Sequence, residues 1–357
     1  MIEILFLLIS ASLLIHLGFY GYFFFKFNQY TQLPKTMDNF PKVSIIVCFK
    51  NDISNIRNHL HHWLEQDYPN YEIVLMDDFS DPWNYDLPKD EKLKYFKVEI
   101  DRPGKKQALK EGIRKSSGEI LLLTDADCVP NTKGWISSMM REIQDQEIVL
   151  GYGPFFKKSS LLNRFQRYET FLTATQYMSY ALRRIPYMGV GRNLAYRHHL
   201  VSNNADILNE SMASGDDDLL IQKIANSRNT GININPESFV YSVAPETFKS
   251  YFRQKMRHHS TSTSYKTGHK ILLSLYSGSQ IMFWLGVLTA SFIANYKFLA
   301  FLPIKWLCQY VFTFKIYKKF MESDLLVWLP FLDFFMFLYY VIFAPLLLIT
   351  KSRTDWK

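Results

Sequence analysis

The stretch Glu119–Asp127 constrains the fold of this chain more than any other, because an apolar run ends there in two carboxylates. Ile120–Leu123 is short and continuously apolar, which is typical of a central parallel strand covered on both faces. Asp125 and Asp127 follow where that strand ends. Since side chains alternate along an extended backbone, both carboxylates point to the same side and together suit a hard divalent cation. The competing interpretation is a pair of aspartates that cap the next helix.

Composition limits the kind of protein that can hold such a site. The 357 residues suffice for a core domain of about 230 residues with further segments. Cys48, Cys128 and Cys308 form no C-x-x-C pair and are too dispersed for a disulfide framework, which favours a reducing compartment. The formal net charge of +8 indicates an anionic partner. Nucleic acid, a phosphorylated ligand and a membrane surface all remain open at this point.

Apolar residues crowd the two ends of the chain, and the first apolar segment predicts a membrane anchor. Ile4–Phe25 is almost uninterrupted and long enough to span a bilayer. Glu3 precedes it and lysines follow it, a charge bias that places the next domain in the cytoplasm. A cleavable signal peptide would need a basic start and a shorter apolar core. The segment Tyr30–Pro41, with two prolines and several polar residues, is typical of a linker.

From Val43 onward, short apolar strands alternate with amphipathic helices, which predicts a doubly wound α/β domain. Ligands bind such sheets beyond the carboxyl ends of the strands. Asp52, the pair Asp77-Asp78 and the acids after residue 124 fall just beyond those ends, so a shared, metal-assisted pocket is predicted there. The absence of G-x-G-x-x-G and Walker motifs in this half argues against a dehydrogenase or a P-loop enzyme. The expected strands are 43–48, 72–76, 95–100 and 119–124, and the expected helices are 53–64 and 105–115.

Two loops are suited to close contact with a ligand. Pro103–Lys106 precedes a helix, so its backbone amides and lysines are placed to meet a diphosphate. A solvated basic turn is the alternative. Tyr187–Asn193 contains a Gly-x-Gly element that lets the backbone approach a ligand, with Asn193 as a hydrogen-bonding partner.

Gly215–Asp218 places three acids at the start of an amphipathic segment. The helix dipole favours acids at a helix start, so capping is the simplest explanation for such a residue. Capping does not require three acids. A carboxylate here is therefore a candidate general base that takes a proton from an attacking hydroxyl.

The stretch Lys249–Lys270 carries basic residues and no acid, and it adjoins apolar sequence directly. Such juxtamembrane clusters mark the cytoplasmic side and attract anionic headgroups, and Arg257 is placed to clamp a phosphate. Nucleic acid is the rival explanation of the charge, but no RNA- or DNA-binding module is recognisable. His258 and His259 are interpreted as pocket or interface residues rather than metal ligands, because adjacent histidines point apart.

The C-terminal part is predicted to be membrane-associated. Its apolar segments are Ile271–Ala294, Phe298–Phe314 and Leu325–Ile349. Asp333 in the last segment should face protein, water or headgroups rather than lipid. Because the lysines at 315–319 and the tail after 350 both look cytoplasmic, we expect the last segment to dip into the membrane or lie at its surface.

Six short motifs follow one another between about Pro41 and Gly268. They are Val43-Ser-Ile-Ile-Val with Asp52, Val74-Leu-Met-Asp-Asp78, Gly104-Lys-Lys with Ala108-Leu109, Thr124-Asp-Ala-Asp127, Gly215-Asp-Asp-Asp218 and Gln254-Lys-Met-Arg257. No single motif is decisive, but their order and spacing together are specific. In these motifs the chain resembles the membrane-anchored family 2 glycosyltransferases, which include cellulose, chitin and hyaluronan synthases and ceramide glucosyltransferase.

This resemblance implies a GT-A fold, an α/β architecture with a doubly wound, mixed and mostly parallel sheet. It also implies a nucleotide-diphosphate sugar donor, with a UDP-sugar favoured, Mn²⁺ or Mg²⁺ as cofactor, and inversion at the anomeric carbon. The matching motifs place the metal on Asp127 and the general base at Asp217. The donor-binding residues that the resemblance implies are Asp52 and Asp78 for the base, together with Lys105, Asp125, Gln254 and Arg257.

One departure from the family pattern bears on the acceptor. The polysaccharide synthases have Gln-x-x-Arg-Trp, and His258 stands here where the tryptophan would be. We therefore expect transfer of a single sugar to a lipid or lipid-linked acceptor at the cytoplasmic membrane face. A processive polysaccharide synthase and an inactive membrane scaffold are the alternatives. The expected domains are an anchor (1–27), a linker (28–41), a cytoplasmic GT-A domain (42–248), a basic interfacial segment (249–270), membrane segments (271–350) and a basic tail (351–357).

Overall fold

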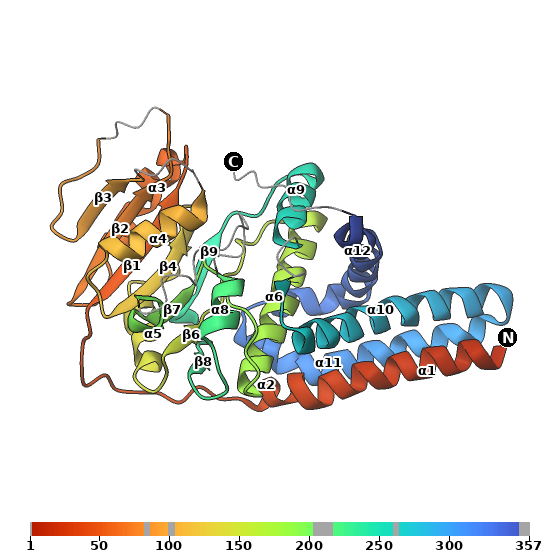
Figure 1. Ribbon diagram of the computed structural model, residues 1–357. Helices are drawn as coiled ribbons and strands as arrows, with labels where there is room; N and C mark the ends of the chain where they lie inside the picture. Colours follow the sequence, from red (N-terminus) through yellow and green to blue (C-terminus); the bar gives the residue numbers. More distant parts are fainter. Residues whose placement is uncertain (1, 82–85, 99–103, 203–216, 260–263, 350–357) are drawn as a thin grey trace. The chain divides into compact units, whose positions relative to one another are not determined.

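The computed structural model describes residues 2–81, 86–98, 104–202, 217–259 and 264–349. The chain forms two compact units, which are coloured along the sequence in Figure 1. The first, here called the helical unit, comprises Met1–Thr31, Lys157–Ser179 and Ser262–Lys351. The second, here called the sheet unit, is built from Gln32–Phe156 and Tyr180–Thr261.

A seven-stranded mixed sheet forms the centre of the sheet unit. Its strands are β1 (Val43–Phe49), β2 (Tyr71–Asp77), β3 (Leu93–Lys97), β4 (Ile120–Asp125), β6 (Ile148–Leu150), β7 (Leu194–Arg197) and β8 (Thr230–Ile232). They lie in the order β3-β2-β1-β4-β7-β6-β8, and only β7 runs antiparallel to its neighbours. A separate pair joins β5 (Cys128–Pro130) and β9 (Val240–Ser242). The expected doubly wound, mostly parallel sheet is therefore confirmed.

The central strands are apolar because both of their faces are covered. Every residue of β1 and β2 is buried, so their sequences are continuous rather than alternating in hydrophobicity. The strands at 43–48, 72–76 and 119–124 occur within one residue of the expected bounds. The expected strand 95–100 is shifted toward the N-terminus and ends at Lys97, and residues 99–100 lie outside the described part of the chain.

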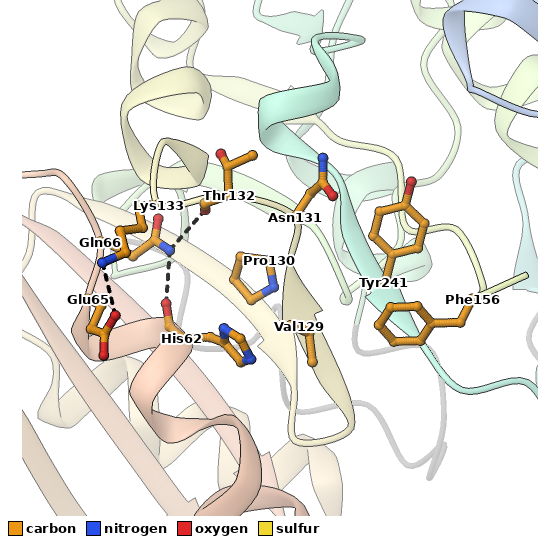
Figure 2. A pocket seen from close by; sticks show the side chains of 10 residues that line it. All are labelled: His62, Glu65, Gln66, Val129, Pro130, Asn131, Thr132, Lys133, Phe156 and Tyr241. Carbon is orange, nitrogen blue, oxygen red and sulfur yellow. Dashed lines mark hydrogen bonds and ion pairs between the residues drawn. The ribbon is translucent and has the colours of Figure 1, made fainter.

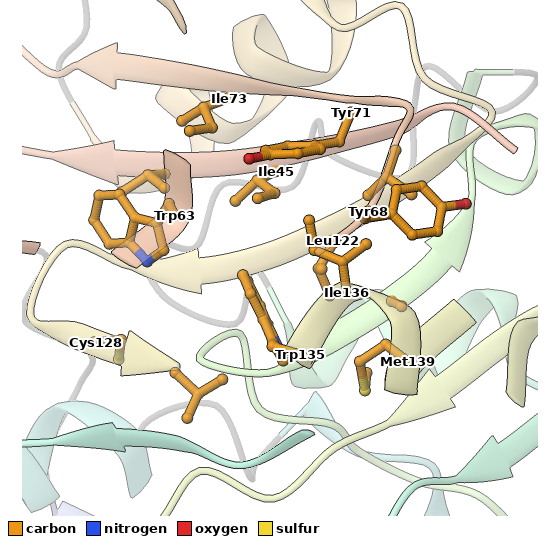
Figure 3. Close-up of a cluster of buried hydrophobic side chains, with 14 of the residues drawn as sticks. Ile45, Trp63, Tyr68, Tyr71, Ile73, Leu122, Cys128, Trp135, Ile136 and Met139 are labelled. Atoms are coloured by element: carbon orange, nitrogen blue, oxygen red, sulfur yellow. The ribbon is translucent and has the colours of Figure 1, made fainter. Parts of the chain in front are cut away.

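Helices pack on both faces of this sheet. Side chains of α3 (Ile53–Leu64) and α5 (Trp135–Ile143) form one buried cluster with alternate residues of β1, and Trp63 and Trp135 are its largest members (Figure 3). The helix α4 (Lys105–Lys115), which has the expected bounds, packs against the other residues of β1 and β2. A Cβ on Gly112 of α4 would lie 2.9 Å from side-chain atoms of Ile46 and Met76, so only glycine permits this close approach. The remaining helices are α7 (His199–Ser202), α8 (Asp218–Ile224), η3 (Pro236–Ser238) and α9 (Phe248–His259).

The predicted linker is bonded to the sheet unit from Gln32 onward. The Gln32 side chain donates to Glu142 and to Asn233, both at 3.0 Å, and its oxygen accepts the Ile234 N–H at 2.7 Å. Lys35 forms ion pairs with Glu142 at 2.7 Å and with the exposed Asp145 at 3.0 Å. This part of the linker is consequently an ordered strap rather than a free tether.

The helical unit contains long apolar helices. Its elements are α1 (Ile2–Phe19), η1 (Tyr20–Phe24), α2 (Phe25–Gln29), most of α6 (Leu161–Leu182), α10 (Thr267–Ile293), η5 (Tyr296–Ala300), α11 (Phe301–Lys319), η6 (Ser323–Trp328) and α12 (Leu329–Ile349). Within the described residues, three helical stretches are long and apolar enough to cross a membrane, namely Ile2–Gln29, Thr267–Ile293 and Ser323–Phe343. The expected apolar segment at 298–314 is mainly α11, which is not among these three stretches.

A buried ion pair joins two helices inside the helical unit. Lys305 of α11 donates to Asp333 of α12 at 2.5 Å, and both side chains are almost fully shielded from solvent. Gln280 donates to the same carboxylate at 2.9 Å and Trp284 at 3.1 Å, both from α10. The Lys305 ammonium also lies 5.5 Å from the ring centroid of Phe283. The expectation that Asp333 faces protein rather than lipid is confirmed.

The first part of α6 belongs with the helical unit, although the sequence placed all of 42–248 in one domain. Arg167 of α6 is buried and pairs with Glu322 and Asp324, the latter at 2.7 Å. Lys157 reaches Asp324 at 2.6 Å. These charges fasten residues 157–179 to the segment between α11 and α12.

Candidate active site

Four aspartates follow three neighbouring parallel strands at the same edge of the sheet. The register pairs Cys48 of β1 with Asp125 of β4, and Phe49 of β1 with Asp77 of β2. Because the carboxyl ends of parallel strands lie together, the acids after each strand share this edge. We call this set the acidic edge; it consists of Asp52, Asp78, Asp125 and Asp127.

Asp125 is the best compensated member of the acidic edge. Its Oδ1 accepts a hydrogen bond from the ammonium of Lys105 at 2.8 Å. Lys105 is the first residue of α4. Burial alone would raise the pKa of the Asp125 carboxyl, but the charges of Lys105, Arg192 and Arg257 outweigh it and hold the pKa below its ordinary value. Asp125 therefore stays ionised.

Asp127 lies in the opposite electrostatic situation. Burial and the nearby Asp125 carboxylate raise its pKa, and Asp52 acts in the same direction. The Cys128 thiol donates to Asp127 Oδ1 at 3.5 Å. Two carboxylates this close repel each other until a positive charge lies between them, so the pair is poised to take a cation.

The donor atoms at this pair suit a hard divalent ion. Ligand atoms of Asp125, Asp127 and Cys128 lie within 4.8 Å of one another. Burial and the two carboxylates raise the pKa of the Cys128 thiol, so its sulfur remains protonated and is a poor metal ligand. The effective donors are carboxylate oxygens, which Mg²⁺ and Mn²⁺ prefer. The residues present thus fit the implied cofactor.

Asp78 connects β2 to the start of α4. Its Oδ1 accepts the Gly104 N–H at 2.9 Å, and burial raises its pKa. Its Oδ2 is buried without a hydrogen-bond partner. The neighbouring Asp77 is different, because its oxygens accept hydrogen bonds from Ser80 N at 3.0 Å and Tyr95 Oη at 2.9 Å. Asp77 supports the fold, whereas Asp78 retains an acceptor for a ligand.

Asp52 occupies the N-cap position of α3 without capping it. Its carboxylate accepts the Asn55 side-chain amide at 2.9 Å instead of a backbone N–H. One turn further along α3, the ring of His59 lies 2.9 Å from the carbonyl oxygen of Ala126, the residue between Asp125 and Asp127. The contact holds α3 against the loop that carries the two aspartates. No sequence pattern predicts this role of His59.

Asp217 joins the acidic segment to the Gly-x-Gly loop. It is the N-cap residue of α8, with Oδ1 accepting the Asp218 N–H at 2.9 Å. Its Oδ2 accepts the Gly191 N–H at 2.6 Å. A Cβ on Gly191 would lie only 3.2 Å from that oxygen, so a glycine suits this contact. Residues 215–216 of the same motif lie outside the described part of the chain.

Arg192 is a further candidate site residue that sequence reasoning missed. Its positive charge lowers the pKa of both Asp125 and Asp127. The guanidinium donates to Ser242 Oγ at 2.8 Å and stacks 4.8 Å from the ring centroid of Phe155. Asn193, the residue expected to meet a ligand, is instead fully buried.

The side chain of Asn193 is used inside the fold, which corrects the expectation for this loop. Its oxygen accepts from Trp135 Nε1 at 3.1 Å, and its amide donates to the backbone oxygens of Tyr152 at 2.9 Å and Ser238 at 2.7 Å. One feature of the sequence could have pointed to Arg192. It directly follows Gly191, the second glycine of the Gly-x-Gly loop, whose backbone N–H contacts Asp217.

The helix α9 supplies the last expected residues. The positive charge of Arg257 contributes to lowering the pKa of the Asp125 carboxyl. Gln254 lies about one turn earlier, and its Oε1 is buried without a partner. Near the end of β4, the Thr124 hydroxyl is also buried without a hydrogen-bond partner, like Asp78 Oδ2 and Gln254 Oε1. Buried polar atoms are normally bonded, so atoms of this kind indicate groups reserved for a ligand. The side chains of His258 and His259 lie outside the described part.

The arrangement of strands and helices has solved counterparts. The structure of a mannosyltransferase from Pyrobaculum calidifontis, in complex with GDP-Man and Mn²⁺, superimposes with a TM-score of 0.58 at 16% sequence identity. The superposition covers 95% of this chain and 99% of that one. At such low identity the likeness shows the shared fold alone.

Curated relatives share detectable sequence. A probable glycosyltransferase, YdaM, of Bacillus subtilis is 27% identical over 279 residues, which is 70% of this chain and 63% of the relative. A poly-β-1,6-N-acetyl-D-glucosamine synthase of Staphylococcus epidermidis is 25% identical over 288 residues, 76% of this chain and 66% of the relative. The chain thus spans slightly less than two thirds of either relative. Residues 44–202 match the model of glycosyl transferase family 2, and they constitute a family 2 glycosyltransferase domain with a GT-A fold.

Proposed function

We propose that the sheet unit transfers a sugar from a nucleotide-diphosphate sugar, with inversion, to a lipid or lipid-linked acceptor at the cytoplasmic face of a membrane. The observation that carries this proposal is the carboxylate pair Asp125 and Asp127 with three cationic side chains around it. A divalent cation needs the two acids, and a diphosphate needs the cations. The same place suits both halves of a metal–diphosphate group.

Each residue at the site has a distinct part in this reaction. Asp127 and Asp125 would hold Mn²⁺ or Mg²⁺, which when bound supplies charge stabilisation to the leaving diphosphate. Lys105, Arg192 and Arg257 add positive charge for the same phosphates. Asp78, with its unpartnered oxygen, and Asp52 are proposed to bind the nucleotide base.

Asp217 is proposed to be the general base. It takes the proton from the acceptor hydroxyl while that oxygen attacks the anomeric carbon from the face opposite the nucleotide. Its oxygens accept the Gly191 N–H and the Asp218 N–H, which hold the carboxylate beside the Gly-x-Gly loop. A diphosphate is a good leaving group without a proton donor, so one base suffices.

A processive polysaccharide synthase is the second candidate. The observation in its favour is the similarity to the synthase from Staphylococcus epidermidis, whose name states polymer formation. Against it stands His258, which replaces the tryptophan of the processive pattern. Product length separates the two, because single transfer gives one product and processive synthesis gives a ladder.

Ligand-dependent stability provides the direct test. The full chain in detergent is heated with UDP, GDP and their sugars, with and without Mn²⁺. A ligand at 100 times its dissociation constant adds about 2.7 kcal/mol of apparent stability. We expect a metal-dependent rise in Tm with UDP-sugars, followed by release of UDP on incubation. No shift with any nucleotide diphosphate would refute the enzyme and favour the inactive scaffold.

A further inference from the structure

The sheet unit holds a cavity of about 290 Å³ that none of the predicted site residues lines. It lies between the C-terminal end of α3 and the two-stranded sheet of β5 and β9 (Figure 2). Its volume is near the lower limit for pockets that bind small ligands. The cavity is therefore large enough for a compact group and too small for a nucleotide sugar.

One wall of this cavity is aromatic. The rings of Phe156 and Tyr241 stack with centroids 5.2 Å apart and planes inclined by 25° (Figure 2). Phe156 is 39% exposed, although exposed phenylalanine forfeits the free energy of burial. An aromatic face is electron-rich and attracts C–H groups that carry partial positive charge. Sugar rings present such C–H groups on their faces.

The polar groups of the cavity balance in charge. Glu65 and Lys133 form an ion pair at 3.0 Å. Burial and the neighbouring His61 and His59 lower the pKa of His62, which is therefore neutral at pH 7. No net charge remains to attract a phosphate, so the lining favours an uncharged, hydroxyl-rich ligand over a nucleotide or an anionic headgroup.

The cavity walls are preformed. The Gln66 side chain donates to the carbonyl oxygens of His62 at 2.9 Å and Thr132 at 3.2 Å, and it accepts the Ile136 N–H at 3.2 Å. Asn131 donates its side-chain amide to Pro236 O at 3.0 Å. Groups fixed in this way lose little further freedom when a ligand binds.

The distance from the acidic edge suits an extended acceptor. β5 starts directly after Asp127, so at about 3.3 Å per residue Val129 to Asn131 lie up to about 7 to 13 Å from that carboxylate along the chain. Along α3, His62 lies about 15 Å from Asp52 at 1.5 Å per residue. A glycan of a few sugar rings spans such a gap.

We propose that this cavity binds a sugar ring of the acceptor glycan at a distance from the hydroxyl that reacts. The proposal rests on the glycosyltransferase function above and narrows its acceptor to a molecule that carries several sugars. Phe156 stacks on the ring, and the amide and imidazole groups of Asn131 and His62 bond its hydroxyls. The cavity takes no part in donor binding.

The test uses Phe156→Ala in the full chain, with Phe156→Tyr as the matched variant that keeps the ring. The probes are oligomers of β-1,6-linked N-acetylglucosamine, of glucose and of mannose, from dimer to pentamer. Saturation-transfer NMR measures their binding, and UDP release measures the reaction. We expect Phe156→Ala to weaken binding of one pentamer series about tenfold, with dimers and the UDP-sugar unaffected and Phe156→Tyr near wild type.

Distinct results separate the two proposals. If UDP-sugars bind but none of the pentamers does, or if Phe156→Ala binds them as wild type does, the cavity is not a glycan site and the transferase function still stands. If UDP-sugars neither bind nor react, the function itself fails. Equal Tm values of the two Phe156 variants establish that a loss of glycan binding is not a loss of folding.

Discussion

The carboxylates of the helical unit and those at the acidic edge of the sheet unit differ in their hydrogen-bond partners. In the helical unit Asp333 has donors on both oxygens, from Lys305, Gln280 and Trp284. At the acidic edge Asp78 has an oxygen without a partner, and Asp127 has a thiol donor and a repelling neighbour. Asp333 and Asp78 are both buried, so the difference between these two carboxylates lies in their partners rather than in their burial, whereas Asp127 is only partly buried.

This difference indicates what each cluster is for. A charge whose partners are all protein groups holds the fold together, and removing one partner strands the other. A charge with unmet hydrogen bonds is less stable in the folded chain and gains most from a ligand. The helical cluster should therefore respond to mutation with lost stability, and the acidic edge with lost binding or rate.

The largest expected effect is on the reaction. Asp217→Asn should lower kcat by about 10² to 10⁴-fold, the usual contribution of a general base, with little change in UDP-sugar affinity or Tm. The amide has nearly the same shape and can still accept one backbone N–H. Single-turnover kinetics with the accepted UDP-sugar provide the measurement.

Asp218→Asn is the control, because Asp218 lies in the same helix start and its carboxylate accepts the Leu219 N–H. A dipole effect would be shared by both residues, whereas proton abstraction requires one. Equal rates for Asp217→Asn and wild type would remove Asp217 from the mechanism.

The second effect is on the stability of the helical unit. Lys305→Met strands the Asp333 carboxylate, and breaking such a pair costs about 3 to 5 kcal/mol. The double variant Lys305→Met/Asp333→Leu should recover much of this loss, because apolar residues of similar size replace both charges. Unfolding in detergent is the readout, with the exposed Lys315→Met on the same helix as control. If the double variant is as unstable as the single one, the loss of stability does not come from the unpaired Asp333 carboxylate.

The third prediction asks whether a carboxylate in the sheet unit behaves like Asp333 when it has partners. Glu72 is buried and accepts from Ser44 at 2.6 Å, Ser117 Oγ at 2.8 Å and Lys94 at 2.6 Å. Burial opposes ionisation of Glu72, but these bonds prevail and lower its pKa to about 2. A folded-state pKa below the unfolded value of 4.5 stabilises the protein above that pH.

This stabilisation, roughly 3 kcal/mol at most, should disappear as the pH falls from about 4.5 to about 2. Urea unfolding of wild type and Glu72→Gln across this range measures it, since the difference between them should shrink toward acid pH. Asp38→Asn, at an exposed position, should give a constant difference. A pH-independent difference for Glu72→Gln would show that ionisation of Glu72 is not the cause.

The smallest effect on stability belongs to Asp127→Asn. Neutralising one of two repelling carboxylates should leave Tm unchanged or raise it slightly, which is the reverse of Lys305→Met. The Mn²⁺-dependent Tm shift with UDP-sugar should be lost at the same time, because an amide replaces an anionic ligand. A clear fall in Tm without ligand would break the comparison between the two clusters.

The sequence predicted most of the sheet and the location of the acids. Strand bounds followed from apolar runs such as Ile120–Leu123, and the acidic edge followed from where those runs end. The strand bounds and the position of the acids both depend on residues that are close in sequence, so a local sequence pattern can predict them. The antiparallel β7 between β4 and β6 had no such local signal.

Pairings between distant residues were beyond the sequence. The sequence singled out Asp333, but its contact with Lys305 depends on how two helices rotate against each other. His59 bonds the carbonyl of Ala126 between the two aspartates, and the charge of Arg192 acts on both of them. Neither partner can be read from the periodicity of the helix or loop that carries the residue. The cavity at Phe156 and Tyr241 joins residues that are remote in sequence, and neither belongs to a motif.

The position of β7 also sets an order of events during synthesis. β4 lies beside β1 on one side, but its other edge pairs with β7, which follows after roughly 70 residues of chain. At a synthesis rate of about 5 to 20 residues per second, that edge waits about 3 to 14 s for its neighbour. An apolar strand with an open edge is a site of aggregation. The nascent chain is consequently vulnerable just when the strand that carries Asp125 has been made, and any ribosome-associated factor that shields it would act in this interval.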